Sequence, residues 1–168
     1  MKSLLLAAVL LLGLGASASV RACDLPPPKE DVILTVSGAI GGCTRDGVAE
    51  FDLKALEALP VTEVKTANPW EKGEVSYQGV RLSVLADTVK ASGETAVFSA
   101  LNDYSSDIPV SDLKKYTIIL AYKREGEYMS VRDKGPLWVI FPFTDSPELS
   151  TETRYAQSVW QVARLTIK

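Results

Sequence analysis

The chain contains no histidine among its 168 residues. This absence excludes Ser-His and Cys-His nucleophile pairs, imidazole-ligated zinc or copper, and histidine-ligated haem. Cysteine is scarce as well, with Cys23 and Cys43 as the only two, and no metal site built from the chain's own side chains is predicted. Basic clusters are also missing, and the formal charge is −3. Nucleic acids and anionic membrane surfaces are therefore not expected as partners.

The first 22 residues have the pattern of a secretory signal peptide. Lys2 supplies the positive charge, and small residues follow the apolar run from Leu4 to Leu14. That run is well short of the ~20 residues that a transmembrane helix needs. Cleavage is expected after Ala18 or after Ala22, the alternative being a membrane anchor or a buried helix. The sequence thus predicts a periplasmic or secreted protein whose mature chain is not stably inserted in a membrane.

The two cysteines favour a structural disulfide, because paired cysteines of exported proteins are usually bridged. A bridge from Cys23 to Cys43 would close a loop of ~20 residues and contribute roughly 3 kcal/mol on the loop-entropy model. It would fasten the Pro26-Pro27-Pro28 arm onto the first predicted hairpin. A redox-active or metal-ligating thiol is the alternative. Residues 23–168, with 16 basic and 21 acidic side chains, are predicted to form one domain with a formal charge of −5.

Apolar periodicity predicts many short strands, separated by turns rich in Gly, Pro and Asn. The predicted strands are 32–37, 48–51, 61–66, 75–77, 95–101, 117–123, 128–131, 137–141 and 159–167. Asp52 is expected to cap a short helix that ends at Pro60, and Ser111 is expected to cap a second helix over 112–116. A third helix is predicted over 80–91, with Gly93 at its C′ position. The fold class is therefore α+β, with strand-dominated mixed sheets and two or three short helices.

Three groups of polar and aromatic residues stand near the ends of predicted strands, where functional sites often occur. The groups are Thr66, Asn68 and Trp70; Asn102, Asp103 and Tyr104; and Arg132, Asp133 and Lys134. If the strands pack as neighbours, two cations, a phenol and an indole would surround one cleft. Such a cleft suits a planar anionic ligand, or an oxyanion such as sulfite or phosphate. Each group alone is better explained as a hydrogen-bonded or solvated turn.

From residue 51 to residue 168 the order of these elements resembles the molybdopterin-binding domain of the sulfite oxidase family. The residues that carry the similarity are Phe51-Asp52 with Leu56 to Pro60, Tyr77 to Val80 with Leu82 and Leu85, Tyr104 with Ile108-Pro109, Ile119 to Tyr122, Arg132 to Pro136, Phe141-Pro142 and the strand 159–167. The resemblance implies a sulfite-oxidase-type molybdopterin-binding domain fold, with molybdopterin as a possible cofactor. It also places Tyr104 at the family's active-site tyrosine.

The chain departs from the family pattern where the cofactor is held. In catalytic members a cysteine thiolate ligates molybdenum, whereas the matching segment 64–70 has no cysteine and places Thr66 or a neighbour there. A hydroxyl cannot replace a thiolate as a soft ligand. The last strand has Trp160-Gln161 where a basic residue followed by Trp is common, and Leu137-Trp138-Val139 lacks a usual arginine. Molybdenum ligation and phosphate anchoring are both weakened.

The family resemblance and the missing cysteine together suggest two alternative functions. The first is an exported ligand- or partner-binding module without Cys-ligated molybdenum, whose cleft is lined by Trp70, Asn102, Tyr104 and Arg132. The second is a molybdopterin-dependent oxidoreductase that transfers an oxygen atom on sulfite- or sulfoxide-like substrates. In that enzyme the dithiolene sulfurs alone would hold the metal, and activity would depend on Tyr104.

A third hypothesis comes from the apolar residues near the end of the chain. A structural or sensory module could act through a periplasmic or membrane-bound sensor protein. Such a module would need an exposed apolar patch. The residues that would form it are Trp138, Phe141, Phe143 and Trp160.

Overall fold

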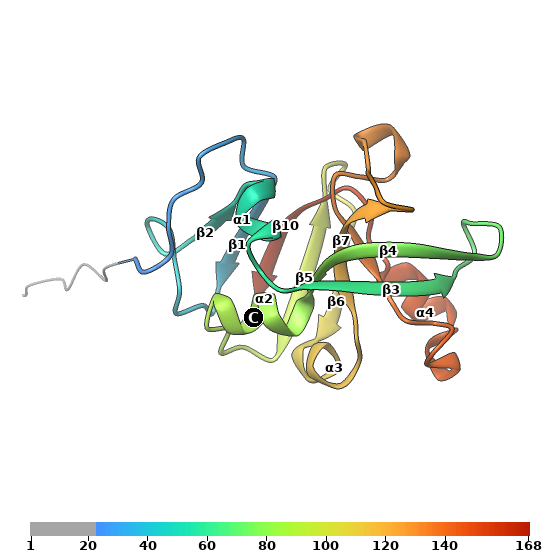
Figure 1. Ribbon diagram of the computed structural model, residues 1–168. Helices are drawn as coiled ribbons and strands as arrows, with labels where there is room; N and C mark the ends of the chain where they lie inside the picture. Colours follow the sequence, from blue (N-terminus) through green and yellow to red (C-terminus); the bar gives the residue numbers. More distant parts are fainter. Residues whose placement is uncertain (1–22) are drawn as a thin grey trace, which may run out of the picture.

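The described part of the chain folds into two five-stranded sheets with short helices packed around them (Figure 1). The structure is a computed structural model and describes residues 23–168, so the predicted signal peptide and its cleavage sites lie outside the described residues. Within 23–168 no helix has the length and apolarity needed to cross a membrane. The predicted α+β class with strand-dominated mixed sheets is confirmed.

The first sheet has the strand order β2-β1-β10-β5-β6. Its strands are β1 (Leu34–Gly38), β2 (Ala49–Phe51), β5 (Thr95–Ala100), β6 (Ser105–Pro109) and β10 (Val162–Ile167). The central strand β10 is parallel to β1 and antiparallel to β5, and the remaining pairs are antiparallel. The last strand along the chain therefore joins the β1–β2 pair to the β5–β6 pair.

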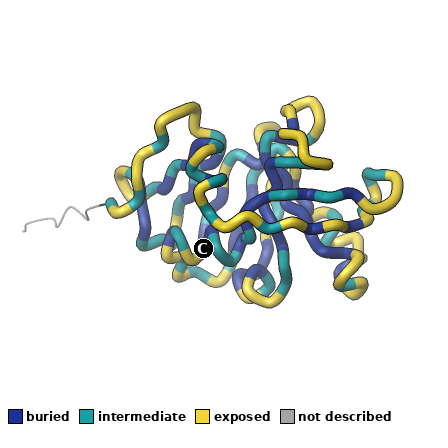
Figure 2. The backbone as a smooth tube through the Cα atoms, viewed as in Figure 1, coloured by how far each residue is buried: buried dark blue, intermediate teal, exposed yellow. Residues whose placement is uncertain are grey.

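The second sheet has the order β3-β4-β7-β8, with β9 also paired to β7. Its strands are β3 (Val61–Ala67), β4 (Glu74–Arg81), β7 (Ile119–Arg124), β8 (Glu127–Tyr128) and β9 (Trp138–Ile140). The strands β3 and β4 form a long hairpin whose tip projects from the body of the molecule (Figure 1). The tip, residues 68–73, contains exposed and partly exposed residues and no buried one (Figure 2).

The apolar run of β7 is buried on both faces of the second sheet. Leu120 and Tyr122 belong to the main core, whereas Ile119 and Ala121 belong to a smaller cluster on the other face. Because successive side chains of a strand point to opposite faces, only a continuous apolar run can fill both clusters. The smaller cluster includes Trp138, and it adjoins the site described below.

Four α-helices are present in the described residues. They are α1 (Leu53–Glu57), α2 (Leu82–Thr88), α3 (Val110–Lys115) and α4 (Glu152–Gln157), and short 3₁₀ turns cover 131–133 and 147–149. The predicted cap Asp52 is confirmed. The predicted C′ position of Gly93 was wrong, because α2 ends at Thr88 with Val89 as its C-cap, and Lys90 adopts the positive φ of 51°. The predicted cap Ser111 was also wrong, because it lies inside α3, after Pro109.

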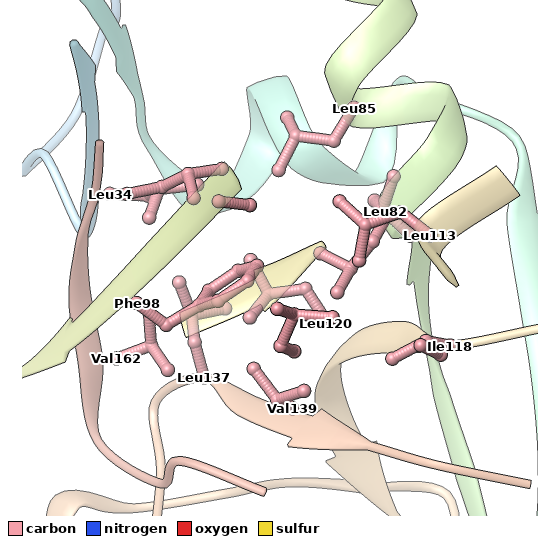
Figure 3. Close-up of a cluster of buried hydrophobic side chains, with 14 of the residues drawn as sticks. Leu34, Leu82, Leu85, Phe98, Leu113, Ile118, Leu120, Leu137, Val139 and Val162 are labelled. Atoms are coloured by element: carbon pink, nitrogen blue, oxygen red, sulfur yellow. The ribbon is translucent and has the colours of Figure 1, made fainter. Parts of the chain in front are cut away.

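The main core lies where the two sheets and the first three helices meet. Figure 3 shows Leu82 and Leu85 of α2 pointing toward Phe98 of β5 and Leu120 of β7. All four side chains are almost completely buried. Burying a side chain of this size stabilises the fold by about 1.5–3 kcal/mol. The same packing fixes the two sheets relative to each other, which places the hairpin tip next to the segment before β10.

The predicted disulfide is confirmed, since Cys23 and Cys43 are bridged with their Cα atoms 4.8 Å apart. The arm that follows Cys23 is fastened as expected, because the Leu25 amide donates to the carbonyl of Cys43 over 3.0 Å. The amides of Lys29 and Glu30 then donate to one oxygen of the Asp52 carboxylate. The arm is thus held to the domain by covalent and hydrogen bonds.

The Asp52 carboxylate is buried and accepts three backbone hydrogen bonds. Its Oδ1 accepts from the Ala55 amide at 2.7 Å, and its Oδ2 accepts from Lys29 at 2.7 Å and Glu30 at 2.9 Å. These amides hold the pKa of Asp52 below its ordinary value, because they favour the charged form. A single carboxylate therefore caps α1 and anchors the N-terminal arm.

Acid is expected to weaken the fold through Asp52. Since the pKa is lowered in the folded state, the stabilisation is present above the unfolded-state value of about 3.9 and is lost as pH falls through the folded-state pKa. We expect Asp52→Asn to lower the free energy of unfolding by about 2 kcal/mol at pH 7. In urea titrations this difference from wild type should shrink as the pH falls through the folded-state pKa of Asp52. A difference that stays constant with pH would contradict the assignment.

Candidate ligand-binding site

A pocket of 330 Å³ opens where the tip of the β3–β4 hairpin meets α4 and the turn before β6. In Figure 1, α4 lies beside the free end of this hairpin. The residues that line the pocket are Trp70, Ala100, Asn102, Tyr104, Tyr155, Ala156, Ser158, Val159 and Trp160. Four of them are aromatic, and none carries a charge at neutral pH. We call this site the aromatic pocket.

The backbone of Trp70 is positioned by hydrogen bonds in the hairpin tip. The Trp70 amide donates to Oδ1 of Asn68 over 3.1 Å, and Nδ2 of Asn68 donates to the hydroxyl of Tyr77 over 2.9 Å. Burial raises the pKa of Tyr77, so this phenol remains neutral. The neighbouring Glu71 forms a bidentate pair with Arg124, with distances of 2.9 and 2.6 Å. The tip is therefore held to β4 and β7 although none of its residues is buried.

All three tryptophans of the chain pack together at this site. Trp70 lies 5.8 Å from Trp138 and 5.7 Å from Trp160 between ring centroids, and Trp138 lies 6.4 Å from Trp160. The ring planes of Trp160 and Tyr155 are both inclined at 83° to that of Trp70. The buried Trp138 packs against the other two indoles, and its Nε1 donates a hydrogen bond to the Ser158 carbonyl over 3.1 Å. The pocket walls are thus perpendicular aromatic rings.

Tyr104 crosses from the turn before β6 to the end of α4. Its hydroxyl donates to the Ala156 carbonyl over 2.8 Å, and its amide donates to Oδ1 of Asn102 over 3.1 Å. The turn is closed by Asp103, which adopts a positive φ of 64°, and by the bond from the Ala100 amide to the Tyr104 carbonyl. The structure therefore brings together three predicted site residues, Trp70, Asn102 and Tyr104.

Thr66 lies in the segment 64–70 where the sequence resemblance would place a metal ligand, and its side chain is fully buried. Its hydroxyl accepts a hydrogen bond from the Thr144 amide at 3.2 Å and donates to the Ala67 carbonyl at 3.2 Å. The Ala67 amide donates in return to the Thr144 hydroxyl. Thr144 and Asn68 line a second, more open pocket of 460 Å³, which also borders Tyr155. In this structure Thr66 ties β3 to the segment that follows β9.

Replacing Thr66 by valine, which has the same shape, tests this structural role. We expect Thr66→Val to lower the free energy of unfolding by about 1–2 kcal/mol, because the Thr144 amide loses its buried acceptor. Chemical denaturation measures this loss. Any binding to the aromatic pocket should persist in the folded variant. A variant with unchanged stability and abolished binding would instead make Thr66 a ligand-contacting residue.

The remaining predicted residues lie outside the lining of the aromatic pocket. Asp103 is exposed and forms an ion pair with Arg164 at 2.8 Å. Arg132 is exposed on its 3₁₀ turn, and Nζ of Lys134 lies 5.3 Å from the ring centroid of Trp138. The Gln161 amide donates to the Lys134 carbonyl, so this turn supports the segment after Trp160. Thr66, Asp103, Arg132 and Lys134 do not line the aromatic pocket, and ligand contacts by these residues stay predictions.

The apolar patch considered for a partner protein does not lie on the surface. Trp138, Phe141 and Phe143 are buried, and Trp160 alone is partly exposed, at 36%. The aromatic rings instead face inward and into the pocket. The hypothesis of a docked sensor protein therefore loses the observation that would have supported it.

Sequence reasoning missed the half of the pocket that α4 and its following loop provide. Tyr155, Ala156 and Ser158 were not singled out, and Trp160 was assigned to a strand that in fact begins at Val162. A signal for α4 was present, because Thr151 followed by Glu152 is a typical helix start, and the Thr151 hydroxyl accepts from the Arg154 amide.

Comparisons with known proteins agree on the fold. The model of the family described as "Oxidoreductase molybdopterin binding domain" matches residues 39–144. Among solved structures, the chain is similar to the sulfane dehydrogenase SoxCD from Paracoccus pantotrophus, with a TM-score of 0.61 and 18% sequence identity. The similarity covers 85% of this chain and 39% of that chain, so this chain spans well under half of that protein's length. A search of curated protein sequences found no match.

Proposed function

Because the chain belongs to the oxidoreductase molybdopterin binding domain family, we propose that it uses this family's fold as an exported module that binds a small molecule in the aromatic pocket. One observation carries the proposal. Four aromatic residues from three separate segments converge on a cavity of 330 Å³, and hydrogen bonds hold two of them in place. Concave, mostly apolar cavities with a few fixed polar groups are the usual form of small-molecule sites.

The residues of this chain do not fit a cysteine-ligated molybdenum cofactor. The chain has two cysteines, and both are consumed by the Cys23–Cys43 disulfide, so no thiolate is available to the metal. The hydroxyl of Thr66 is buried and already hydrogen-bonded. A threonine hydroxyl is also a poor ligand where a soft thiolate is required.

The surroundings of the aromatic pocket also do not fit a phosphate-bearing pterin. No lining residue is cationic, and two arginines on elements that adjoin the pocket are engaged in ion pairs. Arg154 pairs with Asp112 at 2.6 Å, and Arg164 pairs with Asp103 at 2.8 Å. Anchoring a phosphate normally requires charge-assisted hydrogen bonds from such groups. We therefore derive no oxygen-atom transfer for this chain.

Export is part of the proposal and is supported by the disulfide. Disulfides form and persist in oxidising compartments such as the periplasm, and are rare in the cytosol. The bridge fastens the start of the described domain, directly after the predicted signal peptide. We assign the protein to the periplasm or the extracellular space.

The first test is the metal and pterin content of protein purified from its own exported fraction. We expect molybdenum by elemental analysis and pterin by fluorescence to be far below one per chain. Near-stoichiometric molybdenum would overturn the proposal and make the protein an oxidoreductase whose metal needs no protein thiolate.

A second test measures binding directly. Since two of the three tryptophans line the pocket and the third supports it, an occupant should change the intrinsic fluorescence. Pterin, sulfite and choline serve as planar, oxyanionic and cationic probes. We expect at least one of them to bind saturably to wild type and more weakly to Tyr104→Ala, which removes one ring from the lining. If none of the three bound, the pocket would not be a ligand site of the proposed kind.

A further inference from the structure

We infer that the aromatic pocket binds a methylated ammonium group, held by cation–π contacts with the rings that surround it. The inference rests on the proposed function, because it names the ligand class for the same pocket. Aromatic rings set around a cavity are the known means of recognising quaternary ammonium ligands without a charged partner. The geometry and the charges of this site both favour such a ligand over the planar or anionic ones that the sequence had indicated.

The ring orientations favour a compact ligand over a flat one. The planes of Trp160 and Tyr155 stand at 83° to that of Trp70, with centroids 5.7 and 6.1 Å away. A flat ring system could stack on one of these faces but would meet the others edge-on. A roughly spherical trimethylammonium group can contact several perpendicular faces at once. The cavity of 330 Å³ leaves room for such a group and a short substituent.

The charges around the pocket favour a cation over an anion. The lining offers an anion no cationic partner, and Arg154, which precedes Tyr155 on α4, is paired with Asp112. Residues 23–168 carry a net charge of −5, which attracts cations over long range.

The hydrogen-bonding groups favour a methylated ammonium over a primary one. A primary ammonium carries three N–H donors and needs acceptors for them when it leaves water. In this pocket Oδ1 of Asn102 accepts from the Tyr104 amide, and the Ala156 carbonyl accepts from the Tyr104 hydroxyl. The Ser158 carbonyl accepts from Nε1 of Trp138. A quaternary ammonium has no N–H donors and can be bound by the ring faces alone.

The test compares choline with 3,3-dimethyl-1-butanol, which has the same shape and no charge. Isothermal titration of the disulfide-bonded domain should give choline a Kd about ten-fold or more below that of the neutral analogue, as expected for a desolvated cation–π site. Pterin should bind more weakly than choline. Co-sedimentation with phosphatidylcholine vesicles would assign the ammonium group to a lipid. Binding of free choline without co-sedimentation would assign it to a soluble ligand, and both results support the inference.

A matched pair of variants places the binding in the pocket. Trp160 is partly exposed, so Trp160→Leu should fold, and it should weaken choline binding about ten-fold. Tyr128 is an exposed aromatic on β8 outside the pocket, and Tyr128→Leu should leave binding unchanged. Replacing all tryptophans biosynthetically by fluorotryptophan weakens the ring faces with little change in shape. It should lower the affinity for choline and leave that for dimethylbutanol unaltered.

The outcomes separate this inference from the function on which it rests. Equal affinities for choline and dimethylbutanol, or tight binding of pterin without choline, would overturn the ammonium assignment and leave the pocket a ligand site. An affinity for choline that does not respond to Trp160→Leu or to fluorination would also overturn it. Failure of pterin, sulfite and choline alike would remove both the inference and the proposed function.

Discussion

Gly79→Ala is expected to destabilise the domain by about 3 kcal/mol or more, a large share of the 5–15 kcal/mol that stabilises a typical domain. Gly79 lies in β4 opposite a β-bulge in β7, where the register skips Tyr122. A Cβ atom at Gly79 would lie 2.1 Å from the Leu120 carbonyl oxygen and 2.5 Å from Cα of Ala121. These are backbone atoms of the paired strand, so relief requires separation of β4 from β7. Urea denaturation measures the loss.

Gly126→Ala is the matched control for this substitution. Gly126 has a positive φ of 83°, but nothing lies within 4 Å of its added Cβ. Gly126→Ala should therefore lower the free energy of unfolding only through the strain of a positive φ, by about 1 kcal/mol. The comparison separates close packing from backbone conformation. Equal losses in the two variants would show that the sheet relaxes around Gly79 and that the close approach is not limiting.

Trp138→Ala is expected to be the most damaging change near the pocket, with a loss of about 3–5 kcal/mol. The indole is completely buried and packs against Tyr77, Trp70 and Trp160. Its removal also leaves the Ser158 carbonyl without its donor. Thermal and chemical unfolding give the stability change. Near-ultraviolet circular dichroism should lose the signal of the packed tryptophans.

Trp160→Ala supplies the comparison, because the same residue type is here partly exposed. Trp160→Ala should lower the free energy of unfolding by about 1–2 kcal/mol, since Trp160 buries less apolar surface than Trp138 does. The stability losses of the two variants distinguish Trp138, which packs beneath the pocket wall, from Trp160, which lines the pocket. If Trp160→Ala proved as destabilising as Trp138→Ala, the pocket wall itself would be part of the core.

Elements were predicted correctly where the local sequence pattern agrees with the burial and hydrogen bonding found in the fold. The run Ile119 to Tyr122 and the cap Asp52 were assigned correctly, because burial on both faces and capping leave direct marks in the sequence. The resemblance to the sulfite-oxidase-type molybdopterin-binding domain is confirmed by the family match and the structural similarity. The start of α2 was placed too early, because Val80 and Arg81 continue β4 through pairing with β7, which propensity alone does not reveal.

The site was harder to predict because its parts meet only in three dimensions. Trp70 and Tyr104 were selected for their position at strand ends, and both line the aromatic pocket. Arg132 and Lys134 were selected for their charge, but the turn that carries them supports Gln161 through its backbone and does not line the pocket. Tyr155 was missed because it belongs to a six-residue helix, α4, too short to show apolar periodicity.

The central place of β10 in the first sheet has a consequence for the order in which the protein can fold. Pairs such as Val36 with Leu165 join residues from opposite ends of the described chain, and β10 alone bridges the β1–β2 and β5–β6 pairs there. A chain that emerges from its N-terminus must therefore wait for residues 162–167 before this sheet can close. Such distant pairings slow folding, because a long loop must close before they form. The first sheet therefore cannot be completed until almost all of the described chain has been synthesised.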